Sequence, residues 1–199
     1  MAILVAGTAN GQEAGDISAG VGISSLGANL EAAYQIDPTY RVRGAFIGGI
    51  DVSYEESDAD GEFEGNFQLG GLALIGDFYP LQNGWRVSGG LFFSSSELSA
   101  TGTADIDGLG DQDVELTGEF SSAIAPMVTT GYDLRFGDGW SFNSEIGLIF
   151  TGGIDLEVTA DDPLVQGQVD DDADLQDAID DAADISLYPY IGFGLSYTF

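Results

Sequence analysis

The last 13 residues of the chain alternate between apolar positions and small or polar positions. A period of two over this length predicts a β-strand with one apolar side. The apolar side consists of Leu187, Pro189, Ile191, Phe193, Leu195, Tyr197 and Phe199. Similar alternation recurs through most of the preceding sequence, so strands dominate the predicted fold.

Three short turns separate pairs of alternating runs, at residues 36–39, 80–84 and 137–139. They are rich in Pro, Asp, Asn and Gly, which favour tight turns. The other connections, 55–61, 99–118 and 159–184, are longer and acidic. Short turns at one end and long polar loops at the other are typical of transmembrane β-barrels.

The turns give a strand count. The predicted hairpins pair 27–36 with 40–54, 62–79 with 85–98, and 118–136 with 140–157, and the closing strand is 186–199. Because bacterial single-chain barrels have an even number of strands, we assign an eighth strand to 16–24. The alternative is one long bent strand over 17–36. The sequence therefore predicts an all-β, eight-stranded, antiparallel, up-and-down transmembrane β-barrel with short periplasmic turns and long acidic extracellular loops.

One face of the predicted strands carries no charge. On 40–54 this outward row includes Phe46, Ile50, Val52 and Tyr54. Aromatic residues gather near the short turns, where a girdle at the membrane interface is expected. They are Tyr34, Tyr40, Phe78, Tyr79, Trp85, Phe136, Trp140, Tyr197 and Phe199.

The opposite face carries all four arginines of the chain. An eight-stranded barrel is only wide enough inside to be filled by side chains or to hold one small ligand. Buried charges must also be paired. We therefore predict an ion network inside the barrel; its members are Arg41, Arg43, Arg86, Arg135, Glu31, Asp77, Asp133 and Glu145. Asp51 shares the row of Arg41, and Asp77 joins the network if a bulge occurs near residues 70–71. The alternative to structural filling is a gate or a polar site for a small anion.

Composition narrows the function. The 199 residues include 34 acids and four arginines, with a net charge of −30 and no Lys, His or Cys. Nucleic-acid binding is excluded, since it needs clustered cations. Disulfides and Cys-ligated metals are absent. A Ser nucleophile would lack a His base, so we predict no enzyme activity and no catalytic residues.

Two acidic segments suggest further features. Asp105, Asp107, Asp111 and Asp113 are weak candidates for a loosely bound Ca²⁺ or other divalent cation, although their spacing differs from that of an EF-hand. No other cofactor is expected. Within 170–184, apolar residues recur at helical spacing and predict a short amphipathic helix over the barrel mouth. They are Leu175, Ala178, Ile179 and Ala182.

Several stretches carry a resemblance to known proteins. The end of the chain, with Gly194, Tyr197 and Phe199, resembles the C-terminal assembly signal of bacterial outer-membrane β-barrels. Residues 74–91, with an Asp-Phe-Tyr-Pro turn before an Arg-containing strand, resemble an uncharacterised family of small outer-membrane β-barrel proteins of Gram-negative bacteria, as do 124–126, 139–150 and 188–189. OmpA-like and OmpW-like barrels are more distantly similar. The resemblance implies the outer membrane as location, with membrane lipid, lipopolysaccharide and the barrel-assembly machinery as partners, and implies no ligand or reaction.

The predicted organisation is one barrel domain over 15–199, preceded by a tail or signal-peptide remnant over 1–14. We predict a monomeric outer-membrane barrel with a plugged polar interior and a structural or surface-interaction role. One alternative is a porin-like barrel that transports small solutes. Another is a soluble acidic β-protein.

Overall fold

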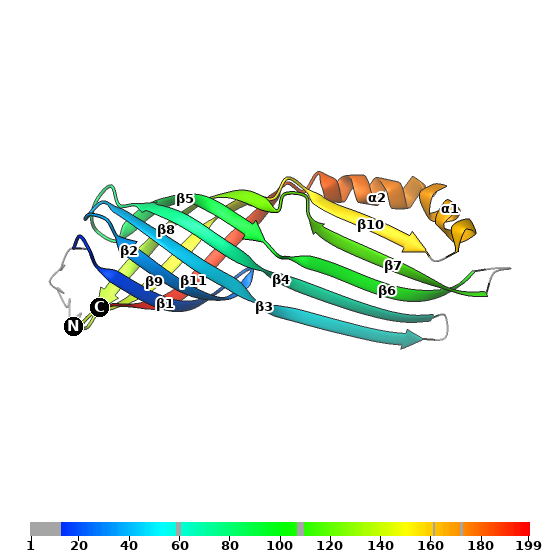
Figure 1. Ribbon diagram of the computed structural model, residues 1–199, viewed down its shortest axis with the longest axis horizontal. Helices are drawn as coiled ribbons and strands as arrows, with labels where there is room; N and C mark the ends of the chain where they lie inside the picture. The colour runs from blue at the N-terminus through cyan, green and yellow to red at the C-terminus, as the bar shows by residue number, and fades with distance from the viewer. Residues whose placement is uncertain (1–12, 59–60, 107–109, 161, 172) are drawn as a thin grey trace, which may run out of the picture.

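Eight antiparallel strands form a closed barrel in the computed structural model, which describes residues 13–58, 61–106, 110–160, 162–171 and 173–199. Within these residues, β1 pairs with β11 and closes the ring β1-β2-β3-β4-β5-β8-β9-β11 (Figure 1). The predicted fold and strand number are confirmed. The strands of the ring are β1 (Ile17–Ser24), β2 (Gly27–Gln35), β3 (Tyr40–Asp58), β4 (Gly61–Phe78), β5 (Trp85–Ser94), β8 (Ile124–Phe136), β9 (Trp140–Phe150) and β11 (Leu187–Thr198).

A five-stranded sheet extends from one end of the ring. The distal halves of β3 and β4 leave the barrel and pair onward with β6 (Glu97–Ile106), β7 (Gly110–Phe120) and β10 (Ile154–Ala160). Two helices, α1 (Pro163–Asp171) and α2 (Ala173–Ala183), pack against β10 (Figure 1). We call this part the extension, and the opposite end of the barrel the short-turn end. No helix in the described residues is long and apolar enough to span a membrane.

The extension corrects the prediction of long loops. Most of 55–61 and 99–118 is strand, and the predicted strands 85–98, 118–136 and 140–157 each divide into a barrel part and an extension part. The register explains the error: Leu98 lies opposite Gly118 and Ala100 opposite Leu116, while Glu97 lies opposite Glu119 on the other face. Period-two alternation was present, but the many acids concealed it.

The predicted acidic helix is confirmed as α2, but its predicted position over the barrel mouth is wrong. It packs against β10, at the edge of the extension. In the neighbouring α1, the Gln166 side chain accepts a hydrogen bond from the Ala160 N–H at 2.8 Å and donates one to the Val158 carbonyl at 3.3 Å. These bonds occupy backbone groups at the free edge of β10, so the helices protect this edge from pairing with another chain.

A bulge in β3 marks the boundary between barrel and extension. The register with β4 shifts between Ile47 and Ile50, where Gly49 has a φ of +86°. Ile50 therefore lies opposite Leu69, and β3 has one more residue than β4 at this point. The side chains of Ile50, Asp51, Val52 and Tyr54 fall outside what the structure describes. The outward row expected through Ile50, Val52 and Tyr54 and the inward position expected for Asp51 therefore stay predictions.

No such shift occurs on β4, so the bulge expected near residues 70–71 is absent there. Alternation runs without a break through Leu69, Ala73 and Ile75 to Asp77, all of which are buried. Asp77 is therefore inside the barrel, as predicted, by regular alternation.

Large apolar side chains cover the outside of the ring. Ile23 is 66% exposed, Leu30 60% and Ile146 57%, and comparable residues recur on every strand of the barrel. Monomeric water-soluble proteins rarely expose contiguous apolar patches beyond about 300–600 Å². The outer surface is therefore suited to lipid.

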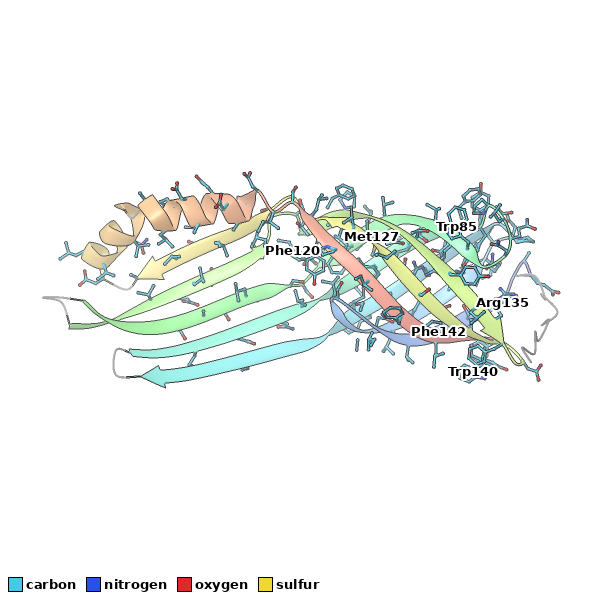
Figure 2. The ribbon with its side chains drawn as sticks, turned by 180° about the vertical axis from the view of Figure 1, so that it is seen from behind. Trp85, Phe120, Met127, Arg135, Trp140 and Phe142 are labelled. Atoms are coloured by element: carbon cyan, nitrogen blue, oxygen red, sulfur yellow. The ribbon has the colours of Figure 1, made fainter. Side chains whose placement is uncertain are left out.

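The predicted aromatic girdle is present at the short-turn end. Figure 2 shows Trp85 and Trp140 at this end. The Trp140 and Tyr197 rings meet edge to face, with their centroids 5.3 Å apart. One predicted member is wrong: Tyr79 is only 1% exposed and contributes to the interior.

The barrel interior has two layers. Toward the extension lies an apolar layer that includes the fully buried Leu26, from the β1–β2 turn, and Phe92. Toward the short-turn end lie the charged residues described below. The remaining buried members of the apolar layer are Ala45, Ile47, Leu69, Ala73, Ile75, Ala125, Met127, Ile149 and Tyr190.

Candidate functional site: the charged interior of the barrel

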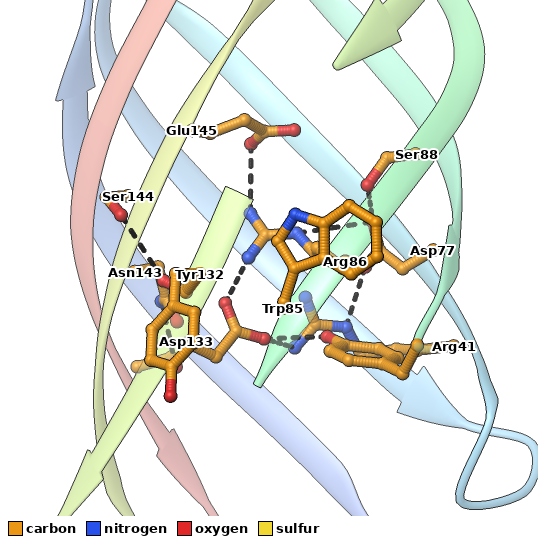
Figure 3. Close-up of polar contacts among 12 residues, drawn as sticks. Arg41, Asp77, Trp85, Arg86, Ser88, Tyr132, Asp133, Asn143, Ser144 and Glu145 are labelled. Atoms are coloured by element: carbon orange, nitrogen blue, oxygen red, sulfur yellow. Dashed lines mark hydrogen bonds and ion pairs between the residues drawn. The ribbon is translucent and has the colours of Figure 1, made fainter. Parts of the chain in front are cut away.

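Inward-facing charges from several strands meet inside the barrel (Figure 3). Arg41 and Arg43 are two residues apart on β3 and so point to the same side. β4 contributes Asp77 and β5 contributes Arg86. All four side chains are buried. From across the barrel, β8 and β9 contribute Asp133 and Glu145. The neighbour of β3, β2, contributes Glu31.

Asp77 connects the three arginines. Its Oδ2 accepts a hydrogen bond from Arg41 Nε at 2.7 Å, and its Oδ1 accepts one from Arg43 Nε at 3.1 Å. The Ser88 hydroxyl donates to the same Oδ1 at 2.6 Å, and Arg86 Nε lies 3.6 Å from it. Asp77 is 2% exposed, so these contacts replace the water that it has lost.

Glu145 contacts two of these arginines, Arg43 and Arg86. Arg43 Nη2 and the Thr129 hydroxyl donate to its Oε1, and Arg86 Nη2 donates to its Oε2 at 3.2 Å. Arg43 Nη1 also donates to Oε2 of Glu31 at 2.8 Å. Each guanidinium thus contacts more than one carboxylate, as expected for charge-assisted pairing in a buried site.

Asp133 completes the network toward the short turns. Arg86 Nη1 donates to its Oδ1, and Arg41 Nη1 lies 3.2 Å from its Oδ2. The Tyr79 hydroxyl donates to Oδ2 at 2.6 Å. Tyr79 follows β4, and burial raises the pKa of its hydroxyl, so it remains protonated and able to donate.

The structure brings together seven of the eight residues predicted for this network. Arg135 is the exception, because it is exposed beside the turn at 137–139. It keeps the inward phase of Asp133 but lies at the end of β8, and with Arg41 and Asp133 it lines a small cavity. Its predicted place inside the ion network is therefore corrected to the rim.

Sequence reasoning missed two members of the network, Tyr79 and Thr129. Tyr79 was assigned to the girdle because it is aromatic and close to a turn. Its position two residues after Asp77, in the same alternation, was the signal for an inward side chain. Thr129 likewise alternates with Met127 and Asp133, but threonine carries no charge that would have drawn attention to it.

Two small cavities adjoin the network. The upper cavity, on the side of the extension, has a volume of about 30 Å³ and is lined by residues that include Glu31, Arg43 and Asn143. The lower cavity, toward the short-turn end, has a volume of about 20 Å³ and is lined by residues that include Arg41 and Asp133. Both are the size of a few water molecules at most.

The candidate cation residues lie in the hairpin of β6 and β7. Asp105 is opposite Asp111, and Asp113 is opposite Thr103. Asp107 falls outside the described residues. Within the described part of the chain, no group of three or more potential ligands is placed to hold a metal ion. Loose cation binding at these loops stays a prediction.

The C-terminal residues lie at the seam of the barrel. Gly194 is opposite Gly22 on β1. The Tyr197 and Phe199 rings meet edge to face, with their centroids 5.2 Å apart. The N–H of Phe199 donates to the Ile17 carbonyl at 2.9 Å. The three residues thus help to close the ring, and their role as an assembly signal stays a prediction.

Comparison with known proteins supports the fold. No protein-family model and no curated protein matches the chain. Among solved structures, CarO2 of Acinetobacter baumannii is similar with a TM-score of 0.63 and 14% identity, over 94% of this chain and 100% of that one. CarO of the same organism is similar with a TM-score of 0.62 and 14% identity, over 92% of this chain and 97% of that one. The fold is that of a small outer-membrane β-barrel.

The shared fold agrees with the predicted outer-membrane location and with the apolar exterior. At this level of identity the likeness concerns the fold alone, and the resemblance seen in the sequence is confirmed to that extent. The charged interior described above is therefore interpreted from this chain's own residues.

Proposed function

We propose that the protein is an integral, monomeric outer-membrane barrel whose interior is closed to solutes and whose role is structural or surface-interacting. It contacts membrane lipid and lipopolysaccharide through its apolar exterior, and it enters the membrane with the help of the barrel-assembly machinery. It performs no enzymatic reaction.

The observation that carries the proposal is the ion pair between Arg43 and Glu145. Their strands, β3 and β9, are four strands apart in either direction around the ring, so this contact crosses the full width of the barrel. Arg41 adds a contact from β3 to Asp133 on β8, three strands away, and Arg86 adds one from β5 to Glu145 on β9, two strands away. Together with the apolar layer around Phe92, these contacts support a plug made of the barrel's own side chains.

The extension supports the surface-interaction part of the proposal. One of its faces carries like charges directly opposite one another, as in the row Glu97, Glu119 and Asp155. Such pairs destabilise a sheet in isolation, so this face is not explained by folding stability alone. Screening by salt or divalent cations outside the cell would relieve the repulsion.

Electrical recording from planar lipid bilayers tests the closed interior. We expect the reconstituted protein to give no steady channel openings, because in this proposal the side chains of the network and of the apolar layer fill the interior. Steady openings in the unmodified protein that vanish or change in conductance in an Arg43→Ala variant would contradict the proposal and establish a transport barrel. A chain that stays monodisperse without detergent would instead favour the soluble alternative.

A further inference from the structure

The inner side of the seam between β1 and β11 is made of small residues. Gly20 lies opposite Ser196, and Gly22 lies opposite Gly194. These positions fill little of the space beside the ion network. Both cavities adjoin this wall, the upper one at Gly20 and Gly194 and the lower one at Ser196.

Asn143 stands between the two cavities. Its side chain lines the upper cavity, and its Nδ2 donates a hydrogen bond at 3.1 Å to Oγ of Ser196, which lines the lower cavity. The lower cavity is also lined by the exposed Arg135, so it lies next to solvent at the short-turn end.

Two polar atoms beside the upper cavity make no hydrogen bond, although one of them, Arg86 Nε, lies 3.6 Å from Asp77 Oδ1. Among the described residues, Asn143 Oδ1 and Arg86 Nε are buried without a hydrogen bond. Arg86 is 1% exposed and also lines the upper cavity. Buried polar atoms are satisfied in nearly all native structures, by protein or by ordered water. A space of about 30 Å³ exceeds the roughly 10–15 Å³ that one water requires.

We propose that the upper cavity is a water-binding site, in which water donates a hydrogen bond to Asn143 Oδ1, and that the Asn143–Ser196 hydrogen bond separates this water from the short-turn end. The inference rests on the proposed closed interior. It adds to that proposal a bound water molecule and the contact, between Asn143 and Ser196, that separates this water from the short-turn end. The apolar layer lies above the site and the Asn143–Ser196 hydrogen bond lies below it, so we expect the bound water to exchange slowly.

Nuclear magnetic resonance of the full chain in detergent micelles tests the site. We expect cross-relaxation between long-lived water and the side-chain amide of Asn143. In an Asn143→Leu variant, which removes the acceptor and fills space with an apolar group, the corresponding signal at the Arg86 Nε–H should fall severalfold or vanish. A matched Ser144→Ala change on the same strand, outside the cavity lining, should leave both signals unchanged.

The Ser196→Ala variant tests the access point without touching Asn143. We expect the water signal at Asn143 to remain while its exchange becomes severalfold faster. Absence of long-lived water in the unmodified protein would overturn the proposal, as would unchanged exchange in Ser196→Ala. Chemical-shift changes at Asn143 that follow sodium concentration at constant ionic strength would overturn it in favour of a bound cation. None of these results alters the bilayer recordings, so failure of the water site is distinguishable from failure of the closed barrel.

Discussion

Replacing Arg86 by methionine is expected to lower the free energy of unfolding by about 3–5 kcal/mol, the usual range when one partner of a buried ion pair is removed. Methionine retains much of the apolar stem of arginine, so the loss of stability arises chiefly from removal of the guanidinium charge. Arg86 contacts Asp133 and Glu145, and both carboxylates are buried. In the variant Asp133 keeps its contact with Arg41 and Glu145 keeps its contact with Arg43, but these two arginines also pair with Asp77 and Glu31.

Urea titration in phospholipid vesicles, followed by the fluorescence of Trp85 and Trp140, measures this loss. The matched control is Arg135→Met. It also removes one arginine at an inward position of the alternation, but this arginine is exposed at the rim of the barrel. We expect the control to change the free energy of unfolding by less than about 1 kcal/mol, as for exposed charges. Equal losses in the two variants would show that the ion network does not stabilise the barrel.

Placing a charge on the outer face is expected to have the second-largest effect. Ile146 lies in the middle of β9, opposite Ile191 of β11, and its side chain is exposed. An Ile146→Arg variant should lose about 2–4 kcal/mol in a bilayer, the cost of arginine near the membrane midplane. The loss arises because the guanidinium must be dehydrated or must draw water and headgroups inward.

Leu81 provides the control for this variant. It is exposed in the short turn at 80–84, beyond the ends of β4 and β5. Leu81→Arg should cost less than about 1 kcal/mol, because charges near the membrane interface are tolerated. The same unfolding titration measures both variants. If Ile146→Arg proves as mild as Leu81→Arg, the apolar exterior is not immersed in lipid.

Alternation along the strands made most of the barrel predictable. Successive side chains of a strand point alternately into and out of the barrel, so one known position fixes the others on that strand. The three tight turns mark where one strand ends and the next begins. This is why Glu31, Arg43 and Glu145, which are far apart in sequence, were correctly placed in one network. The eighth strand followed from the requirement for an even number together with the alternation over 16–24, since the turn at Ser25 carries no strong signal.

The bulge in β3 was not predictable because Gly48 and Gly49 stand where the phase changes. Glycine fits either face of a strand, so the sequence reads equally well with or without an added residue. Tyr79 was misplaced for a different reason. An aromatic residue near a turn suits both a membrane girdle and a buried hydrogen bond, and only the Asp133 partner, 54 residues away, decides between them.

A scan of β11 with single spin labels tests the central claim most directly, since the chain contains no cysteine and each introduced cysteine marks one position. In a lipid bilayer, labels at Ile191, Phe193 and Leu195 should be accessible to oxygen dissolved in lipid, because these side chains are exposed. Labels at Gly192 and Gly194 face the interior and should be protected. A period of two in oxygen accessibility is the predicted result. Uniform accessibility along β11, or access of a water-soluble relaxing agent to the three apolar positions, would contradict a closed barrel embedded in lipid.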